Sequence, residues 1–518
     1  MKASYNLIHQ NWIICENIDQ GLVKYNLKNL FYNLEKIYDL ADPCPIVNAS
    51  LLRFLVVLMI EIFNPVSIND LQKLFSDGLE HEKIIKYFNT FENRFDLFAK
   101  KYPFFQADDK RVRPKSVLKM IHHFSSGNNA TLFDHHSEKD GITLQPDEAA
   151  RYLIANQFFG LGGLSGIPEK FTNSPAQKGI NFFIKGETLK ETLLLNCFLY
   201  HGDKAGGIPL TGNDLPAWRM DDPFVSRNIP YGLKDYLTWL NRRIRLIPEP
   251  TENGFVVRRM TDGPGLRLDD SFIDGQSIRD PFHFYYQGSN SILPEKFSEN
   301  KAIWRDSAAL FSFETYGQRN LLAPEIVLHL QYLVNRKVIS DQRLFRLSAM
   351  GMASDKAKIL FYQQEELPIP VKYLENINLV RELNVMLELG ENCSKKLFGA
   401  LSVYARIAVD GNDNSEENGR LKKLSQDAEK FREHLGGDRF FWVEAQRGFL
   451  DLLIDLPVNE EGAKNNWVNH LRLTTLSAFD QAITFSGNST RYQEAAVIAE
   501  KSLWFNLNEI LGQKEVIE

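Results

Sequence analysis

Cysteine is scarce in this sequence: there are four in 518 residues, and the closest two, Cys15 and Cys44, are 29 positions apart. No CxxC pair occurs, which disfavours a cysteine-ligated zinc site and a framework of disulfide bonds. Cytosolic thiols are kept reduced, and so few cysteines fit that environment. We therefore expect a cytoplasmic protein without a cysteine-bound metal.

A secretion signal and long apolar runs are also missing. The first residues, MKASYNLIHQNWII, contain neither a basic stretch nor a continuous apolar one, so we expect no signal peptide. The most apolar segment, residues 51–63, is 13 residues long and carries Arg53 and Glu61. A helix needs about 20 apolar residues to cross a bilayer. Residues 51–63 are therefore predicted to form a buried core helix, and we expect no membrane partner.

The charge balance excludes one class of nucleic-acid-binding protein. Lys and Arg total 60 against 66 Asp and Glu, which gives a net charge of -6, so this chain does not coat nucleic acid by bulk charge. Basic residues are nevertheless concentrated locally, because residues 100–119 hold seven Lys or Arg against two Asp. Such a segment predicts either a local phosphate-binding surface or a solvated charged face.

A second basic cluster consists of five arginines: Arg242, Arg243, Arg245, Arg258 and Arg259. In a strand, alternate residues share a face, so Arg243 and Arg245 would lie opposite Ile244. This alternation is typical of a basic surface that follows a nucleic-acid backbone and covers an apolar core. The alternative is that these arginines form salt bridges with surface carboxylates.

The chain changes character near residue 370. Residues 168–310 are rich in Pro, Gly and β-branched or aromatic residues, with short strands predicted at 180–184, 244–247, 255–259 and 283–286. Apolar residues then recur at helical spacing in four segments: 374–408, 421–435 (which can continue through 440–454), 467–485 and 492–511. We predict an α+β fold with a large mixed N-terminal domain (residues 1–370) and a C-terminal antiparallel four-helix bundle (residues 371–518).

Two segments of the N-terminal domain have the composition of loops. Residues 125–141, SSGNNATLFDHHSEKDG, are polar and turn-rich and carry Leu132 and Phe133, which predicts a long exposed loop. Residues 160–166, GLGGLSG, follow a predicted helix and match neither GxGxxG nor GxxxxGK[ST]. A backbone without Cβ atoms can approach another surface closely. That surface is either a nucleic-acid groove or, as the sequence alone favours, a neighbouring part of the chain.

Four histidines and a carboxylate within residues 122–136 raise an enzymatic alternative. His122, Asp134 and His135 would be the metal ligands of a nuclease or phosphohydrolase. However, metal ligands are usually held on rigid elements, whereas Asp134 and His135 lie on the predicted loop. No HExxH, Ser-His-Asp, Cys-His or GxSxG arrangement occurs. We therefore expect no catalytic residue, no metal and no cofactor, and the metal-dependent enzyme is the alternative hypothesis.

Nine short motifs occur in the same order as in one known family. They are NWI (11–13), PFFQ (103–106), SGNNATLFDH (126–135), NQFFGLGGLSG (156–166), ETLLLN (191–196), LTWLNRRIRLIPE (237–249), DPFHFY (280–285), WRDSAAL (304–310) and GMASDKAKIL (351–360). With the helical C-terminus they cover nearly the whole chain. The sequence resembles the CasA-type large subunit of the type I-E CRISPR surveillance complex, Cascade.

This resemblance implies a non-enzymatic reader of double-stranded DNA. In the family, a large mixed domain and a C-terminal four-helix bundle lie at one end of a complex with other Cascade subunits and CRISPR guide RNA. The subunit recognises the short motif beside the target, the PAM, from the minor groove, and helps to open the duplex for guide-RNA pairing. It also provides the docking site for the interference helicase-nuclease. Base pairing with the guide reads the rest of the target.

The resemblance implies roles for two loops. The guide-RNA and subunit-contact loop would act through four residues: Asn129, Leu132, Phe133 and Asp134. The minor-groove loop would act through three glycines: Gly160, Gly162 and Gly163. Gly163 is the best match to the contacting glycine of the family. A third hypothesis is a purely structural interaction subunit, in which a change at Gly163 would leave DNA binding intact.

The duplex-splitting wedge of the family matches Asp355 and Lys356. Ser354 is a candidate helix cap, so we predict Lys356 on the first turn of a helix, whose N-terminus favours a nearby phosphate. Some relatives have Gln at the wedge tip; lysine cannot accept a hydrogen bond, so a contact here must be donated. Arg267 in GLRLDD is the nearest match to the lysine finger of the family. A zinc site of two cysteine pairs, found in some members, is missing here.

Overall fold

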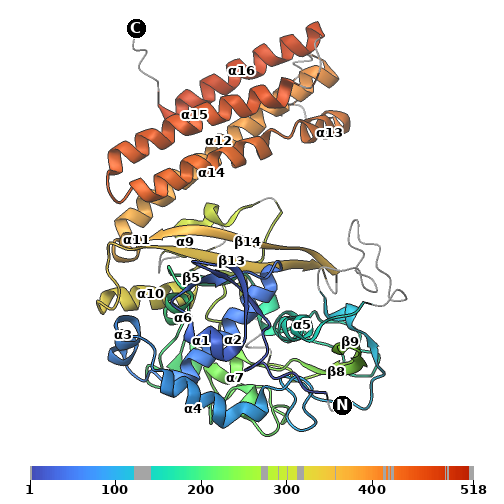
Figure 1. Cartoon of the computed structure of the whole chain (residues 1–518). Coiled ribbons are helices and arrows are strands. Elements are labelled where there is room, and N and C mark those ends of the chain that lie inside the picture. The colour runs from blue at the N-terminus through green and yellow to red at the C-terminus, as the bar shows by residue number, and fades with distance from the viewer. Residues whose placement is uncertain are drawn as a thin grey trace. The chain divides into compact units, whose positions relative to one another are not determined.

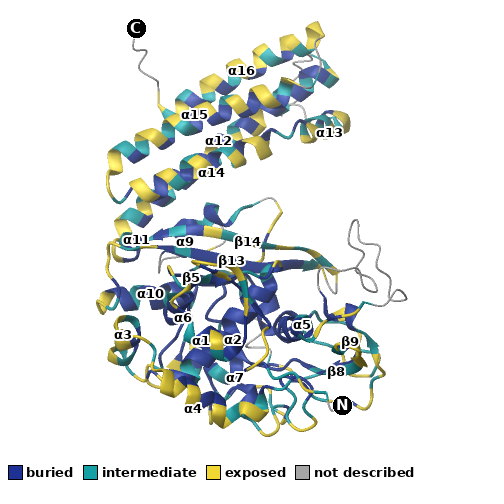
Figure 2. Cartoon of the chain, viewed as in Figure 1, coloured by how far each residue is buried: buried dark blue, intermediate teal, exposed yellow. Residues whose placement is uncertain are grey.

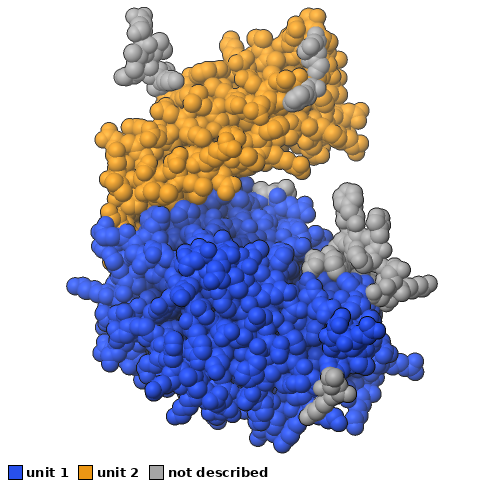
Figure 3. All heavy atoms as spheres, in the orientation of Figure 1, with its two compact units in different colours: residues 1–371 blue, residues 372–518 orange. Residues whose placement is uncertain are grey.

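The structure is a computed structural model. It describes residues 3–121, 142–269, 278–289, 291–299, 301–311, 320–355, 358–411, 416–417, 420–421, 425–484, 486 and 489–512. The chain divides into two compact units, unit 1 (residues 1–371) and unit 2 (residues 372–518), as Figure 1 and Figure 3 show.

Helix α2 (Pro45–Phe63) forms the centre of unit 1. Pro45 lacks the N–H that a first helical residue would leave unpaired, and Asn64 ends the helix in the left-handed conformation at φ 44°. By length and composition this helix is apolar enough to cross a membrane, but 89% of its apolar window is buried within the fold (Figure 2). The predicted core helix is confirmed, and it begins at Pro45 instead of residue 51.

The remaining elements of unit 1 surround α2. The other helices are α1 (Leu27–Tyr32), α3 (Ile68–Ser76), α4 (His81–Phe91), α5 (Pro146–Phe159), α6 (Leu189–Leu195), α7 (Leu233–Leu237), α9 (Ser307–Leu310) and α10 (Glu325–Asn335). The strands are β1 (Ile13–Asn17), β2 (Gly21–Tyr25), β3 (Ile37–Leu40), β4 (Lys115–Ser116), β5 (Asn181–Lys185), β6 (Lys204–Ala205), β7 (Ile208–Pro209), β8 (Arg242–Thr251), β9 (Gly254–Pro264), β10 (Tyr285–Gln287), β11 (Ile292–Pro294), β12 (Leu321–Leu322), β13 (Leu344–Asp355) and β14 (Lys358–Pro370). The described strands pair in the orders β2-β1-β3, β4-β9-β8, β11-β10-β12, β14-β13-β5 and β6-β7. Unit 1 is therefore a mixed helix and sheet structure, as predicted.

The strands predicted in the middle of the chain are present. β8 and β9 cover the predicted segments 244–247 and 255–259 and are longer than expected, whereas β5 is shifted by one residue from the predicted segment 180–184. β10 begins at Tyr285, two residues after the predicted start at His283. These segments were recognisable because β-branched and aromatic residues are enriched in them.

The helix predicted after Ser354 is absent, and the prediction was wrong. Ser354 and Asp355 end β13, which pairs in antiparallel register with β14 from Asp355↔Lys358 to Leu344↔Pro370. Along β14 the exposure alternates from residue to residue, which is the period of a strand. The local Ser cap signal was overridden by pairing with β14, where Ser354 lies opposite Ile359. Lys356 lies outside the described residues.

Unit 2 is helical, with α11 (Lys372–Glu375), α12 (Ile377–Asp410), α13 (Gln426–Leu435), α14 (Gly437–Asp455), α15 (Glu460–Thr484) and α16 (Thr490–Leu511). Gly436 adopts the left-handed conformation (φ 65°) and separates α13 from α14, so the predicted segment 421–435 does not continue as one helix. Residues 420–421 belong instead to a short strand, β16 (Arg420–Leu421), paired with β15 (Glu416–Glu417). The Ser425 side chain caps α13, which therefore starts later than expected.

Apolar residues at helical spacing form the core of unit 2. On α16 the buried positions Ala495, Ala499, Leu503 and Leu507 recur every fourth residue. Trp467 of α15 is buried, and its Nε1 donates to the Met386 carbonyl of α12 at 2.9 Å. The small Ala side chains allow α16 to pack closely on α12, while the ring of Trp467 fills the space between α15 and α12.

Candidate functional site

The glycine cluster forms one limb of a closed loop, residues 160–174, named the glycine loop below. It starts at the end of α5, and the Ser174 N–H donates to the Gly160 carbonyl at 2.8 Å where the chain returns. Between the limbs, Gly163 and Phe171 exchange two backbone hydrogen bonds of 3.1 and 2.9 Å. Leu164 near the turn is 87% exposed. The glycine loop is thus a short, hydrogen-bonded projection from the end of a buried helix.

Two of its glycines are closely packed against neighbouring parts of the chain. A Cβ atom at Gly160 would lie 2.6 Å from the Asn156 carbonyl oxygen, and one at Gly162 would lie 3.0 Å from Asn173 Oδ1. The Gly162 N–H also donates to Asn173 Oδ1 at 2.6 Å. The sequence left two explanations for the glycines: close approach to a nucleic-acid groove or to a neighbouring part of the chain. The second explanation applies to Gly160 and Gly162. Gly162 and Gly163 remain partly accessible.

Arg242, at the start of β8, lies against both limbs of the glycine loop. It is 2% exposed, and its guanidinium donates to the carbonyl oxygens of Leu161 at 2.6 Å and Thr172 at 2.9 Å. Its guanidinium carbon is 4.5 Å from the centroid of the Phe171 ring. Burial lowers the pKa of Arg242 to about 10, which still leaves it charged at neutral pH. Arg242, a member of the second basic cluster in the sequence, lies on the buried face of β8 with Ile244.

Asn241 joins the glycine loop to the segment that carries Arg267. Its Nδ2 donates to Thr172 Oγ1 at 2.8 Å and to the Leu266 carbonyl at 3.2 Å. Its Oδ1 accepts a hydrogen bond from Ser174 Oγ at 3.0 Å. Arg267 itself is exposed and directly follows Leu266. Two of the predicted DNA-binding elements, far apart in sequence, are thereby held next to each other.

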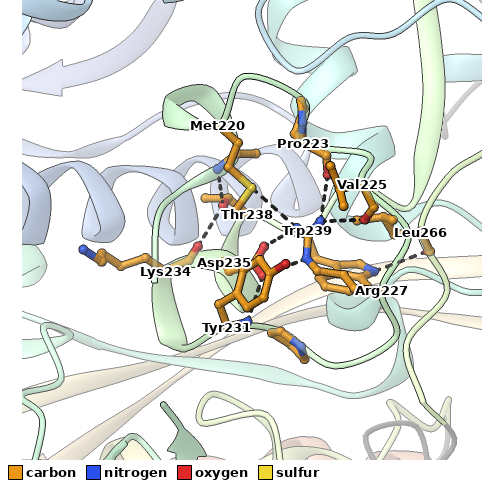
Figure 4. A network of polar contacts seen from close by, with 12 residues as sticks. Met220, Pro223, Val225, Arg227, Tyr231, Lys234, Asp235, Thr238, Trp239 and Leu266 are labelled. Carbon is orange, nitrogen blue, oxygen red and sulfur yellow. Dashed lines mark hydrogen bonds and ion pairs between the residues drawn. The ribbon is translucent and has the colours of Figure 1, made fainter. Parts of the chain in front are cut away.

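A second arginine, Arg227, supports the Leu266 backbone through Trp239, as Figure 4 shows. Arg227 forms a bidentate ion pair with Asp235, at 3.0 and 2.6 Å, and its guanidinium carbon lies 4.9 Å from the Trp239 ring centroid. Trp239 Nε1 in turn donates to the Leu266 carbonyl at 3.3 Å. Two donors, from Trp239 and Asn241, therefore fix this carbonyl. Arg267 projects from a backbone that is held rigidly.

The tip of the β13–β14 hairpin lies beside the base of the glycine loop. The 3-10 turn η3 (Pro175–Lys178) follows the loop, and its Gln177, 1% exposed, donates from Nε2 to Ser354 Oγ at 2.9 Å. Asp355, the next residue, is exposed at the end of β13. The three elements selected by the resemblance thus belong to one hydrogen-bonded region of unit 1. We refer to this region as the candidate interface.

Several cations of the two basic clusters are paired with carboxylates. The pairs are Arg111 with Asp109 and Glu169, Lys115 with Asp262, and Arg258 and Arg259 with Glu249. In the isolated chain these four cations therefore form salt bridges, which was the alternative to a nucleic-acid-binding surface. Arg243 and Arg245 lie opposite the buried Ile244, as predicted. Exposed ion pairs contribute little to stability, so they can be exchanged for contacts with phosphate.

Two predicted groups of residues cannot be placed. Asn129, Leu132, Phe133 and Asp134 of the guide-RNA loop lie outside the described residues. The same is true of His122 and His135, on which the metal hypothesis depends. Among the residues that the structure does describe, no group of three or more His, Cys, Asp or Glu could hold a metal ion.

The residues that hold the candidate interface together were not singled out in the sequence. They are Phe171, Gln177, Trp239 and Asn241. Each acts through a segment far along the chain, and no local pattern marks such contacts. The one available signal concerned Arg242, because the strand period of RRIRL assigns it to the face of Ile244 and Leu246.

Comparisons with known proteins agree over almost the whole chain. The family model described as CRISPR-associated protein Cse1 matches residues 6–478. CRISPR-associated protein CasA/Cse1 of Thermus thermophilus is 27% identical over 524 residues, which cover 98% of this chain and 98% of that protein. The crystal structure of Cse1 from Acidimicrobium ferrooxidans has a TM-score of 0.80 at 19% identity, with 99% of both chains covered. A chain of a structure described as a CRISPR RNA-guided surveillance complex has a TM-score of 0.75 at 21% identity, with 97% and 100% covered.

Proposed function

The chain belongs to the CRISPR-associated CasA/Cse1 family of type I-E subunits, and we propose that it acts as the large subunit of an RNA-guided Cascade surveillance complex. The fold shared with a chain of such a complex, at a TM-score of 0.75, supports this role. Its partners would be other Cascade subunits and CRISPR guide RNA. In this role the chain is a binding subunit in the cytoplasm, not an enzyme, and needs neither a cofactor nor a membrane.

Within the complex, the candidate interface would read the PAM from the minor groove of target DNA. The observation that carries this proposal is the hydrogen-bonded link from the glycine loop to the Arg267 segment through Asn241. The B-DNA minor groove is only about 6 Å wide, so a backbone without side chains at Gly162 and Gly163 suits it. Arg267 would contribute a charge at the edge of the groove.

The β13–β14 hairpin would then help to part the duplex. Asp355 ends β13 and Lys358 begins β14, so a paired ribbon would present this segment instead of a helix N-terminus. Without a helix N-terminus next to Lys356, the charge of the Lys356 side chain would have to make the phosphate contact. The two strands are paired from Leu344↔Pro370 to Asp355↔Lys358, so the ribbon would reach the duplex as one hydrogen-bonded unit.

Other contacts of the complex fall on other parts of the chain. Asn129, Leu132, Phe133 and Asp134 would contact guide RNA and the adjoining subunit, since the apolar side chains of a loop predicted to be exposed usually bind something. The interference helicase-nuclease would dock on this subunit. The long helices of unit 2 would act as an antiparallel four-helix bundle.

Gly163→Asp tests the PAM-reading proposal. A carboxylate placed at the groove would face the phosphate backbone, so affinity for a PAM-bearing duplex should fall roughly tenfold or more while assembly of the complex is retained. The measurement is an electrophoretic mobility shift with assembled complex. Gly254→Asp is the matched control, because Gly254 also has a positive φ (126°, against 156° at Gly163) and a Cβ there meets nothing within 4 Å. Unchanged affinity in the Gly163→Asp complex would remove the glycine loop from the DNA site and favour a purely structural subunit.

A further inference from the structure

We propose that Arg242 is a positioning residue that fixes the glycine loop in the conformation that reads the PAM, an inference that rests on the proposed function. Its guanidinium bonds to one carbonyl on each limb, at Leu161 and Thr172. It also donates to the Asn241 carbonyl at 3.1 Å and to the Asn241 side-chain oxygen. A planar fork of donors can hold several acceptors at once, which the single ammonium of lysine cannot do in the same geometry.

The position of these bonds makes Arg242 more than a packing residue. Leu161 lies two residues before Gly163, and Thr172 directly follows Phe171, the backbone partner of Gly163. The Phe171 ring covers the guanidinium at 4.5 Å and is itself partly exposed. Both limbs are therefore tied to β8 close to the glycine that would meet DNA. Losing this tie would let the limbs separate while the rest of unit 1 keeps its contacts.

The charge of Arg242 also lacks a carboxylate in direct contact. Within the described residues, Arg242 forms hydrogen bonds to carbonyl oxygens and a contact with the Phe171 ring, but no ion pair. A more distant carboxylate, that of Asp262, attracts its charge. Asp262 already forms an ion pair with Lys115. The electrostatic field of a buried charge without a paired carboxylate extends to its surroundings, because little water screens the charge. The resulting positive potential lies directly behind a loop that would approach phosphate groups. Arg242 would therefore both shape the loop and favour an anionic partner.

The test compares assembled complexes that carry single substitutions, with PAM-bearing and PAM-free duplexes in parallel. Arg242→Lys keeps the charge but loses the fork, so affinity for the PAM-bearing duplex should fall roughly tenfold. Binding to the PAM-free duplex should change little, so PAM discrimination is lost. Exchange of the Gly163 amide, which bonds to Phe171 in the wild type, should accelerate by a similar factor.

Two controls separate positioning from general stability. Arg472 of unit 2 is also buried and donates to the Gly512 carbonyl at 2.6 Å, so Arg472→Lys is the matched change away from the loop and should leave discrimination intact. If Arg242→Lys does not fold, Phe171 provides the second arm. Phe171→Leu removes the ring over the guanidinium and should weaken PAM binding roughly threefold, and Phe171→Tyr should restore it.

Each outcome decides between the alternatives. Loss of PAM discrimination in Arg242→Lys or Phe171→Leu, with restoration by Phe171→Tyr, supports the positioning role. Wild-type discrimination in those variants, together with weakened binding by Gly163→Asp, overturns the role of Arg242 and leaves the proposed function standing. Wild-type binding by Gly163→Asp as well would overturn the proposed function and this inference with it.

Discussion

Gln177 and Ser354, 177 positions apart in the sequence, share a hydrogen bond of 2.9 Å between Gln177 Nε2 and Ser354 Oγ. The Gln177 Oε1 atom is buried and has no hydrogen-bond partner among the described residues. Among the described residues, the bond to Ser354 is therefore the one hydrogen bond of the Gln177 side-chain amide. It connects the turn after the glycine loop to the tip of the β13–β14 hairpin, so the two elements are expected to move together.

Ser354→Ala tests this connection. The substitution leaves the buried Gln177 amide without a partner, which should lower the free energy of unfolding of unit 1 by about 1–2 kcal/mol. Ser348 on the same strand is also buried, but its Oγ has no partner in the described structure, so Ser348→Ala should change stability by less than about 0.5 kcal/mol. Urea unfolding of both variants provides the measurement. Equal effects would mean that the hydrogen bond carries no specific energy.

Gly160→Ala should destabilise the protein by about 1–3 kcal/mol, because the new Cβ would lie 2.6 Å from the Asn156 carbonyl oxygen. The backbone of Gly160 (φ -59°) suits any residue, so the cost is steric and not conformational. Gly78→Ala is the control, with open space around the added Cβ. Thermal unfolding measures both, and a Gly160→Ala protein as stable as wild type would show that the helix end can relax.

Lys356→Ala should slow strand separation on a fully paired, PAM-bearing duplex while binding to a pre-opened bubble stays nearly intact. The reason is that only the closed duplex requires a cation where the strands part. Fluorescence of 2-aminopurine at the first target base pairs reports the opening rate, with Lys86→Ala, on the exposed face of α4, as the control. Equal opening rates for Lys356→Ala and wild type would place the wedge elsewhere.

His329 should make unit 1 sensitive to acid. Burial lowers its pKa to about 4, and its Nε2 lacks a partner within the described residues. The unfolded chain, with a pKa near 6.5, binds the proton first, so the titration of His329 has no effect on stability well above that pH and destabilises the fold as pH falls towards 4. Between pH 7.5 and 4.5 the contribution lost is about 2 kcal/mol. The unfolding free energy of His329→Gln should fall less steeply than that of wild type, and parallel curves would contradict the assignment.

Helices and strands with a clear pattern of apolar or β-branched residues were predicted from the sequence alone. The continuous apolar run before Phe63 gave α2, and β-branched and aromatic residues gave β8 and β9. The hairpin tip was misjudged because Ser354 resembles a helix cap when its neighbours alone are considered. In the fold, Ser354 pairs with Ile359 across the hairpin, and this register depends on a partner strand that no local signal reveals.

The candidate interface was predictable only in part. The motifs selected the glycine loop, Arg267 and Asp355 separately, and the hydrogen bonds that join them were not foreseeable. Asn241 illustrates the reason: its side chain bonds to Thr172 and to Leu266 at once, so its role exists only after three segments have met. Such a residue follows no period, and a polar side chain between Leu240 and Arg242 has many other possible positions.

The burial of α2 has a consequence for synthesis of the chain on the ribosome. α2 is covered by α5, α6 and β13, and β13 is complete only at Asp355. At about 5–20 residues per second, translation from Phe63 to that point takes on the order of tens of seconds. Until then a 19-residue apolar helix lacks part of its native cover. The nascent chain therefore offers chaperones a binding segment early, and their supply during translation should strongly influence how much of the protein is recovered in folded form.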